Sequence, residues 1–333
     1  MSNRVPKIPS RAVLAHAVTG SGLCGKLAAT DLVPLARRGL AHLHWRLRGK
    51  GLLLRVPVDG VPDLLARQAE TFRRMAPSGH TPRLHGVIAA SERLPGGALV
   101  VEAVRGRDPV VPRDLLAIAA ALAAIHDLPL PPPDARPPLL SPADPFQATL
   151  ATIERHLDLA WPALPAAVRA PLAAAREEAR AYAMQHAAAL AAAPRALVIT
   201  DAHPRNFIIR ADGRAICVDL EKALYGAPAI DLAHATLPAA IAWGRAGERV
   251  TQADRQRFLA AYFRGRGPAA AAIKPWLGPM TSLVWLRTTA AFAAFQTGGA
   301  ARILGPAARR IAERAIARAL DPKELAAHRP EWA

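Results

Sequence analysis

The sequence predicts an α+β protein with two lobes, a small one built on an antiparallel sheet and a larger one built of helices. Three observations predict this class. Residues 39–104 show short apolar runs separated by turn residues, whereas residues 112–192 carry long Ala- and Leu-rich helical patterns. A strand–turn–strand pattern at residues 197–218 interrupts the helical half. At 333 residues, the chain is long enough for two lobes with substantial cores.

The small lobe opens with a β-hairpin. Residues 39–57 partly alternate between apolar and polar side chains and contain a glycine turn at residues 49–51. A helix follows at residues 62–75, where apolar residues recur at helical spacing and arginines occupy the side expected to face solvent. Two further strands are expected at residues 82–86 and 97–102, which complete the sheet.

The larger lobe begins with a strong helical pattern at residues 113–126, ended by the run LPLPPP. The Pro-rich stretch 129–145 is interpreted as a loop rather than a domain boundary. Further Ala-rich helices are expected at residues 146–158 and 165–192, and helices resume after Asp231.

Composition limits the possible partners. The net charge is +17, from 43 Lys and Arg against 26 Asp and Glu. Such a charge suits nucleic acid, an anionic membrane or a phosphorylated ligand, or it reflects an arginine-rich composition alone. The charge is spread along the chain without a basic block interleaved with aromatics, so we do not expect a nucleic-acid partner.

Cysteine content and hydropathy predict the compartment. Cys24 and Cys217 are too few for a disulfide framework, and neither has a metal-ligand partner nearby in the sequence. The N-terminal residues lack the apolar core of a signal peptide, and charge or proline interrupts the apolar segments before they reach membrane-spanning length. We therefore expect a cytoplasmic protein with no membrane insertion.

The residues with the clearest chemistry surround the predicted hairpin. Asp201 follows the apolar run LVIT, Asn206 precedes the first strand of the hairpin, and Asp219 follows the second. A hairpin brings Asn206 close to Asp219, and a short loop keeps Asp201 near both. Two carboxylates and an amide can bind Mg²⁺ through oxygen and leave one carboxylate to orient a hydroxyl group. This set of residues is typical of phosphoryl transfer, although Asp and Asn are also common in ordinary turns.

This stretch resembles the catalytic motif of the aminoglycoside phosphotransferase and choline kinase superfamily, H-G-D-x-H-P-x-N followed by I-D-[WF]-E. The corresponding residues here read ITDAHPRN, residues 199–206, and VDLE, residues 218–221. The resemblance implies a protein-kinase-like bilobal fold with ATP and Mg²⁺ as cofactors. It assigns residues 1–104 to a nucleotide-binding lobe and residues 105–333 to a helical catalytic and substrate lobe. The departure is Ile199 where the family usually has His, with Thr200 at the following Gly or Asn position.

The resemblance also assigns roles to single residues. Asp201 matches the catalytic base, and Asn206 and Asp219 match the metal ligands. Arg55 matches a strand residue that contacts the ATP phosphates, where Lys or Arg occurs. Glu70 matches the helix glutamate that pairs with this basic residue.

Two more assignments concern the segments around the motif. The adenine is expected to bind the backbone between Glu102 and Val104, in the segment that joins the lobes. Asp231, at the start of the helical run DLAHA, is expected to hold the backbone of the catalytic loop rather than to touch substrate.

The acceptor is the least determined part of the prediction. Glu221 is a candidate for a contact to metal or substrate. Trp285 lies in a helical stretch that resembles the Trp-bearing helix of choline kinases, although helical core packing explains the same pattern. We expect an ATP- and Mg²⁺-dependent kinase that phosphorylates the hydroxyl of a small molecule, most like the choline and amino-alcohol kinases. The alternative is a catalytically weak kinase-like protein that binds a nucleotide or a partner.

Overall fold

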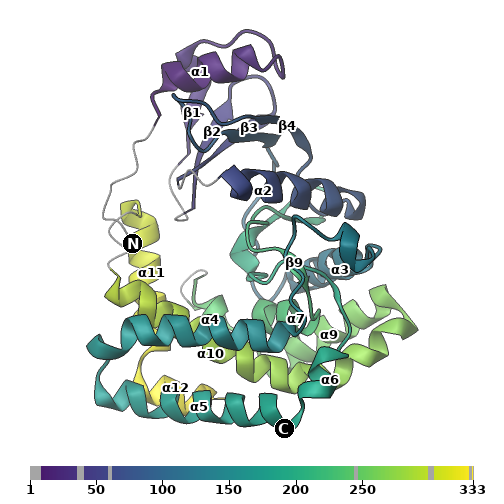
Figure 1. Ribbon diagram of the computed structural model, residues 1–333, viewed down its shortest axis with the longest axis vertical. Helices are drawn as coiled ribbons and strands as arrows, with labels where there is room; N and C mark the ends of the chain where they lie inside the picture. Colours follow the sequence, from purple (N-terminus) through teal and green to yellow (C-terminus); the bar gives the residue numbers. More distant parts are fainter. Residues whose placement is uncertain are drawn as a thin grey trace.

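The computed structural model of the chain describes residues 9–35, 41–58, 62–243, 247–298, 304–329 and 332. A small antiparallel sheet with its helices forms one end of the molecule, and a larger helical part forms the other (Figure 1). This is the α+β architecture that the sequence predicts. No helix in the described part of the chain is long and apolar enough to span a membrane.

The sheet has the strand order β1-β2-β3-β5-β4, and every neighbouring pair is antiparallel. The predicted hairpin is confirmed, because β2 pairs with β3 from His42↔Pro57 to Leu47↔Leu52. The expected loop near Arg38 and Gly39 lies outside the described residues. The strands are β1 (Leu32–Pro34), β2 (His42–Leu47), β3 (Leu52–Pro57), β4 (Leu84–Ile88) and β5 (Ala98–Glu102).

Two helices cover the two faces of this sheet, α1 (Arg11–Gly20) and α2 (Pro62–Met75). Side chains alternate between the faces of a strand, so neighbours in sequence join different cores. On β5, Ala98 and Val100 pack in the cluster that contains α1, whereas Leu99 and Val101 pack in the cluster that contains α2. The same alternation on β3 directs Arg55 to the α2 face, where its guanidinium lies 5.6 Å from the ring centre of Phe72.

The helical part is built around two packed helix pairs. α4 lies along α10, and α3 packs against α9 (Figure 1). The predicted helix 165–192 is divided, because it ends at Gln185 and resumes at Ala187. The helices are α3 (Leu115–His126), α4 (Pro145–Ala160), α5 (Ala166–Gln185), α6 (Ala187–Ala191), α7 (Ala229–Thr236), α8 (Pro238–Ile241), α9 (Gln252–Arg266), α10 (Leu277–Thr297), α11 (Pro306–Ala319) and α12 (Pro322–His328).

Short 3₁₀ turns connect several of these elements. They are η1 (Ala29–Asp31), η2 (Ala76–Ser78), η3 (Pro133–Ala135), η4 (Trp161–Ala163), η5 (Pro204–Asn206) and η6 (Pro268–Trp276). Turn η5 is part of the catalytic loop, because it joins the Asp201 segment to the hairpin that follows.

Two small two-stranded sheets lie between the main sheet and the helices. β6 (Ala196–Val198) pairs with β9 (Leu224–Gly226), and β7 (Phe207–Ile209) pairs with β8 (Ala215–Cys217). The second pair is the predicted catalytic hairpin.

The catalytic hairpin is bonded to the chain that precedes the helical part. Arg107 exchanges two backbone hydrogen bonds with Ile209, at 3.0 and 2.9 Å, and the Cys217 amide donates to the His80 carbonyl at 2.8 Å. Gly106 permits this approach, because a Cβ at that position would lie 2.3 Å from the Ile209 carbonyl oxygen.

Candidate active site

The β7–β8 hairpin brings Asn206 and Asp219 together, as the sequence predicts. Phe207 pairs with Cys217, and the Val218 amide donates to the Asn206 carbonyl at 2.8 Å. The Asn206 side-chain nitrogen donates to the Asp201 carbonyl at 2.8 Å. This hydrogen bond joins the hairpin to the Asp201 loop and leaves the Asn206 side-chain oxygen as an acceptor.

Asp219 has the character of a cation ligand. Its Oδ1 atom is buried and has no hydrogen-bond partner, and the nearest cation is the Arg55 guanidinium at 3.8 Å. Burial and the nearby Glu221 raise the pKa of Asp219, with Arg55 acting in the opposite direction. A divalent cation satisfies such an orphaned oxygen, and the Asn206 amide oxygen is a second hard ligand. The described residues contain no group of three or more His, Cys, Asp or Glu arranged for a metal, so further ligands would come from water or phosphate.

A strained backbone precedes Asp201. Thr200 has φ of 62°, the one non-glycine residue with positive φ in the described chain. This left-handed conformation is unfavourable for a β-branched residue, so the surrounding contacts must hold it. The Thr200 hydroxyl donates to the Lys222 carbonyl at 3.0 Å, and Arg287 donates to the Thr200 carbonyl.

Asp231 anchors the same segment, which confirms its predicted role. This carboxylate is fully buried and accepts the backbone amides of Ile199 and Thr200, both at 2.7 Å. It also contacts the Nε2 atom of His126 at 3.0 Å, and the Nδ1 atom of His126 lies 2.9 Å from the Tyr262 hydroxyl. A carboxylate only accepts hydrogen bonds, so His126 carries its proton on Nε2.

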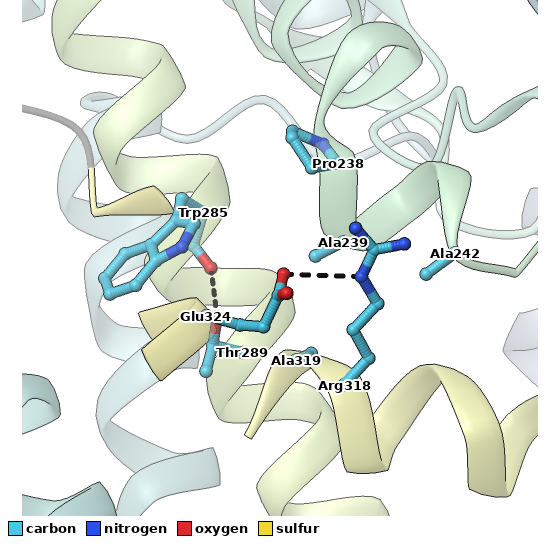
Figure 2. Close-up of a pocket in the computed structure, with 8 residues that line it drawn as sticks. All are labelled: Pro238, Ala239, Ala242, Trp285, Thr289, Arg318, Ala319 and Glu324. Atoms are coloured by element: carbon cyan, nitrogen blue, oxygen red, sulfur yellow. Dashed lines mark hydrogen bonds and ion pairs between the residues drawn. The ribbon is translucent and has the colours of Figure 1, made fainter. Parts of the chain in front are cut away.

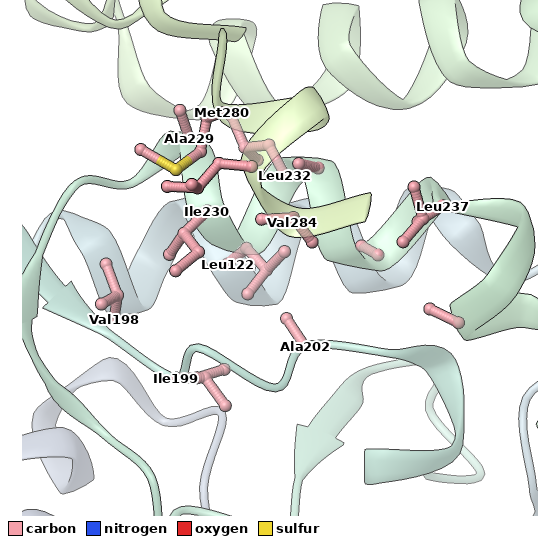
Figure 3. Close-up of a cluster of buried hydrophobic side chains, with 14 of the residues drawn as sticks. Leu122, Val198, Ile199, Ala202, Ala229, Ile230, Leu232, Leu237, Met280 and Val284 are labelled. Atoms are coloured by element: carbon pink, nitrogen blue, oxygen red, sulfur yellow. The ribbon is translucent and has the colours of Figure 1, made fainter. Parts of the chain in front are cut away.

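The anchor explains how the loop forms without the usual motif histidine. Ile199 is fully buried and belongs to the large hydrophobic core together with Val198 and Ala202. Figure 3 shows these apolar side chains beside those of α3, α7 and α10. Here the buried partner of Asp231 is His126 from α3, and Ile199 supplies its amide and an apolar side chain.

Four basic side chains surround the Asp201 carboxylate. Lys222 Nζ lies 2.6 Å from Oδ2, while His234 Nδ1 and His203 Nε2 lie 3.5 and 3.9 Å from Oδ1. Arg287 reaches the neighbouring Thr200 carbonyl. Burial raises the pKa of Asp201, but its basic neighbours, Lys222 above all, outweigh it and hold the pKa well below its ordinary value. Burial lowers the pKa of both His203 and His234, so these two rings are neutral at neutral pH. Asp201 is therefore ionised at neutral pH.

The predicted ion pair between Arg55 and Glu70 is not formed. Arg55 donates to the Val218 carbonyl at 2.7 Å and faces Asp219. Glu70 instead pairs with Arg74 at 2.8 Å and with Arg73 at 3.4 Å. The reason is local, because residues three and four positions apart lie on one face of a helix.

The helical pattern predicted that Arg74 faces solvent, and this prediction is wrong. It donates to the carbonyls of Arg136 and Pro137 and to the Tyr225 hydroxyl. These contacts tie α2 to the helical part of the molecule.

The two residues predicted to bind adenine have different surroundings. The Glu102 amide already donates to the Arg83 carbonyl, and its side chain pairs with Arg210. Val104 has no such partner in the described chain and lines a pocket between the β2–β3 turn and the segment after β5, together with Leu47.

The structure separates the two acceptor candidates from each other. The Glu221 carboxylate pairs with His42 Nδ1 at 3.0 Å and so joins β2 to the catalytic hairpin. Trp285 is buried and lines a different pocket, beside the ion pair of Arg318 and Glu324 (Figure 2). Helical geometry explains its position, because Arg287, two residues later on α10, faces the catalytic loop instead.

Sequence reasoning missed three groups at this site. Lys222 directly follows the VDLE run, and its position three residues after the predicted metal ligand Asp219 could have indicated a place in the site. His234 lies three residues after Asp231 on α7, which places it on the same face of the helix. Arg287 had no signal, because only the packing of α10 against α7 and α4 brings it to the loop.

Comparison with known proteins identifies the family. The phosphotransferase enzyme family model matches residues 34–276, and the chain belongs to this family. A search of curated protein sequences finds no match.

Solved structures with the same fold include kinases of several substrates. A choline/ethanolamine kinase family protein from Mesorhizobium loti is 21% identical with a TM-score of 0.57, covering 96% of this chain and 97% of its own. Choline kinase LicA from Streptococcus pneumoniae is 17% identical with a TM-score of 0.58, covering 94% and 99%. The streptomycin-ATP-APH(2")-IIa ternary complex is 13% identical with a TM-score of 0.54, covering 90% and 96%. At these identities, the similarity shows a kinase-like fold and no substrate.

Proposed function

We propose that this protein transfers the γ-phosphoryl group of ATP to the hydroxyl group of a small molecule. The observation that carries the proposal is the convergence of Asp201, Asn206 and Asp219 around one hairpin, with an ionised carboxylate and an orphaned buried oxygen. Phosphoryl transfer depends mainly on positioning and on neutralising charge, and these groups suit both tasks.

In this proposal, Asp201 accepts the proton of the acceptor hydroxyl and orients its oxygen toward the phosphorus atom. The side-chain oxygens of Asn206 and Asp219 would hold Mg²⁺, which when bound neutralises the phosphate oxygens. Arg55 lies beside Asp219, with its guanidinium fixed by the Val218 carbonyl, and would bind the phosphate oxygens. Asp231 and Arg287 hold the loop that carries the base.

Residues 1–104 are proposed as the nucleotide-binding lobe and residues 105–333 as the catalytic and substrate lobe. The pocket beside Val104 supports this division, because it is bounded by the small sheet and by the segment that leaves it. The ATP in the solved ternary complex of this fold is consistent with a nucleotide cofactor.

The direct test measures ATP consumption with and without Mg²⁺ against a panel of small alcohols. Asp201→Asn should lower kcat by about 10²- to 10⁴-fold and retain nucleotide binding, because the amide cannot accept the proton. Asp212→Asn is the matched control, since this exposed aspartate lies in the turn of the same hairpin and bonds only a backbone amide. Equal activity of Asp201→Asn and the control would refute the assigned base.

One observation favours a second candidate, a kinase-like protein that binds nucleotide with little turnover. The Lys222 ammonium lies on Asp201 at 2.6 Å, where the acceptor hydroxyl would bind. Mg²⁺-dependent nucleotide binding without turnover on any acceptor would support this candidate.

A further inference from the structure

The charge of the groups beside Asp201 restricts the acceptor. Lys222 is half exposed, at 57% of its side-chain surface, whereas Asp201 is 21% exposed. The lysine is therefore the more exposed partner of this ion pair. Burial opposes the charge of Lys222, but the attraction of Asp201 is the larger effect and raises the Lys222 pKa. An acceptor hydroxyl that binds the Oδ2 atom of Asp201 must compete with this cation.

Helix α10 adds a second positive charge near Asp201. Arg287 comes from α10, which contains no Asp or Glu in its 21 residues. His156, on the adjacent helix α4, has a buried Nδ1 atom without a hydrogen-bond partner. Burial lowers the pKa of His156, and the charges of Arg155, Lys222 and Arg287 lower it further. Lys222 and Arg287 give the site a cationic wall, defined here as these two side chains, and the lowered pKa keeps the nearby His156 ring neutral.

The carboxylates of the site are already engaged. Asp201 pairs with Lys222, and Glu221 pairs with His42. Asp219 faces Arg55 and is assigned to Mg²⁺ in the proposed function. A cationic amino alcohol would find no free carboxylate in this group and would be repelled by Lys222 at close range.

One hydrogen bond shows that Lys222 is held in place. The Thr200 hydroxyl donates to the Lys222 carbonyl at 3.0 Å. Thr200 stands where the related motif usually has glycine or asparagine, and it keeps its side chain despite a φ of 62°. The residue that departs from the motif therefore fixes the backbone of the cation that covers the base.

We propose that the acceptor is an anionic hydroxy compound whose carboxylate or phosphate group binds Lys222 and Arg287. The proposal rests on the proposed function and narrows its substrate class. When the acceptor binds, the Lys222 ammonium pairs with the anionic group of the acceptor instead of with Asp201. The Asp201 carboxylate can then accept a hydrogen bond from the acceptor hydroxyl. The hydroxyl oxygen then forms a bond to the γ-phosphorus, the bond from this phosphorus to the β,γ-bridging oxygen breaks, Asp201 takes the proton, and ADP leaves.

The test compares acceptors that differ mainly in charge. D-glycerate and glycerol 3-phosphate present a carboxylate and a phosphate, glycerol is neutral, and choline is cationic. The wild-type protein should show kcat/KM at least about 10-fold higher for one of the anionic compounds than for glycerol, and lower still for choline. The anionic compound with the higher kcat/KM shows whether the cationic wall binds a carboxylate or a phosphate group.

Lys222→Met supplies the second arm. It should raise KM for the anionic acceptor about 10-fold or more and so reduce the ratio of anionic to neutral kcat/KM. Lys323→Met is the matched control on the exposed side of α12 and should leave that ratio unchanged. A uniform loss of kcat on every acceptor would overturn the proposal, because Lys222 would then act on the transferred phosphoryl group. A uniform gain would also overturn it, because Lys222 would then only block the base.

The outcomes separate this inference from the proposed function. Preference for choline over the anionic compounds refutes the inference and leaves the kinase assignment intact. Nucleotide binding without turnover on any acceptor refutes the kinase assignment. In that case, the shift in Tm on adding D-glycerate or glycerol 3-phosphate tests the anion site. A shift that is present in the wild type and lost in Lys222→Met supports the site, and no shift in the wild type excludes it.

Discussion

Replacing Asp231 by alanine removes the acceptor that holds the catalytic loop. The carboxylate is fully buried and takes hydrogen bonds from two backbone amides, those of Ile199 and Thr200, and from His126. A buried donor left without a partner costs about 1–3 kcal/mol, and breaking a buried charged pair costs about 3–5 kcal/mol. Water that enters the vacated space recovers part of this, so we expect a loss of about 3–5 kcal/mol.

Two assays measure this loss: denaturant titration gives the free energy of unfolding, and thermal unfolding gives Tm. A loss of about 3–5 kcal/mol corresponds to a fall in Tm of about 6–20 °C, taking about 2–4 °C per kcal/mol for a large domain. Amide hydrogen exchange should rise selectively at Ile199 and Thr200, because both amides lose their acceptor. Asp212→Ala is the control and should cost about 1 kcal/mol or less, since it removes one exposed hydrogen bond.

A loss below about 1 kcal/mol for Asp231→Ala would refute the reasoning. It would mean that the loop keeps its conformation through packing and through the bond from Arg287 alone. Unchanged exchange at Ile199 and Thr200 would lead to the same conclusion.

The remaining predictions concern single residues around the loop and the sheet. Glycine at position 200 should make the protein about 1 kcal/mol more stable than alanine there, because φ is 62°; denaturant titration of Thr200→Gly and Thr200→Ala checks this, and equal stability contradicts it. Ile199→His should lower Tm and not raise kcat, because Asp231 already has a histidine partner in His126; a gain in turnover would contradict it. Burial, with Arg55 and His42 adding to it, lowers the pKa of His44 to about 3, below its unfolded value of about 6.5. The neutral ring is favoured in the folded state, so this stability is complete above about pH 6.5 and is lost as pH falls toward 3; at pH 5 the loss is at most about 2 kcal/mol. In His44→Gln, the decrease in unfolding free energy from pH 7 to pH 5 should be smaller by that amount, and an unchanged decrease would refute the assignment.

The fold and the hairpin could be predicted because their signals are local. Alternation, helical spacing and a glycine turn are read within about fifteen residues, and the strand pairs β2–β3 and β7–β8 formed as expected. The Asp231 contact was also predictable, because its role follows from one motif.

The missed features depend on distances that the sequence does not encode locally. Glu70 had three possible arginine partners, and it pairs with Arg73 and Arg74 of its own helix rather than with Arg55 on a strand. Arg287 reaches Thr200 across 87 positions, and only the packing of α10 sets that contact. The contact between His126 on α3 and Asp231 on α7 joins residues 105 positions apart, so no local pattern predicts it.

The bonds of the catalytic hairpin determine which parts of this protein can move together. The hairpin carries Asp219 and is fastened to the small lobe through Arg55 and through the hydrogen bond from the Cys217 amide to the His80 carbonyl. The base is fastened to α7 and α10 instead. The hydrogen bond from the Asn206 side chain to the Asp201 carbonyl joins these two segments. In the proposed function, the separation of Asp219 and Asp201 would therefore depend on contacts made by both lobes.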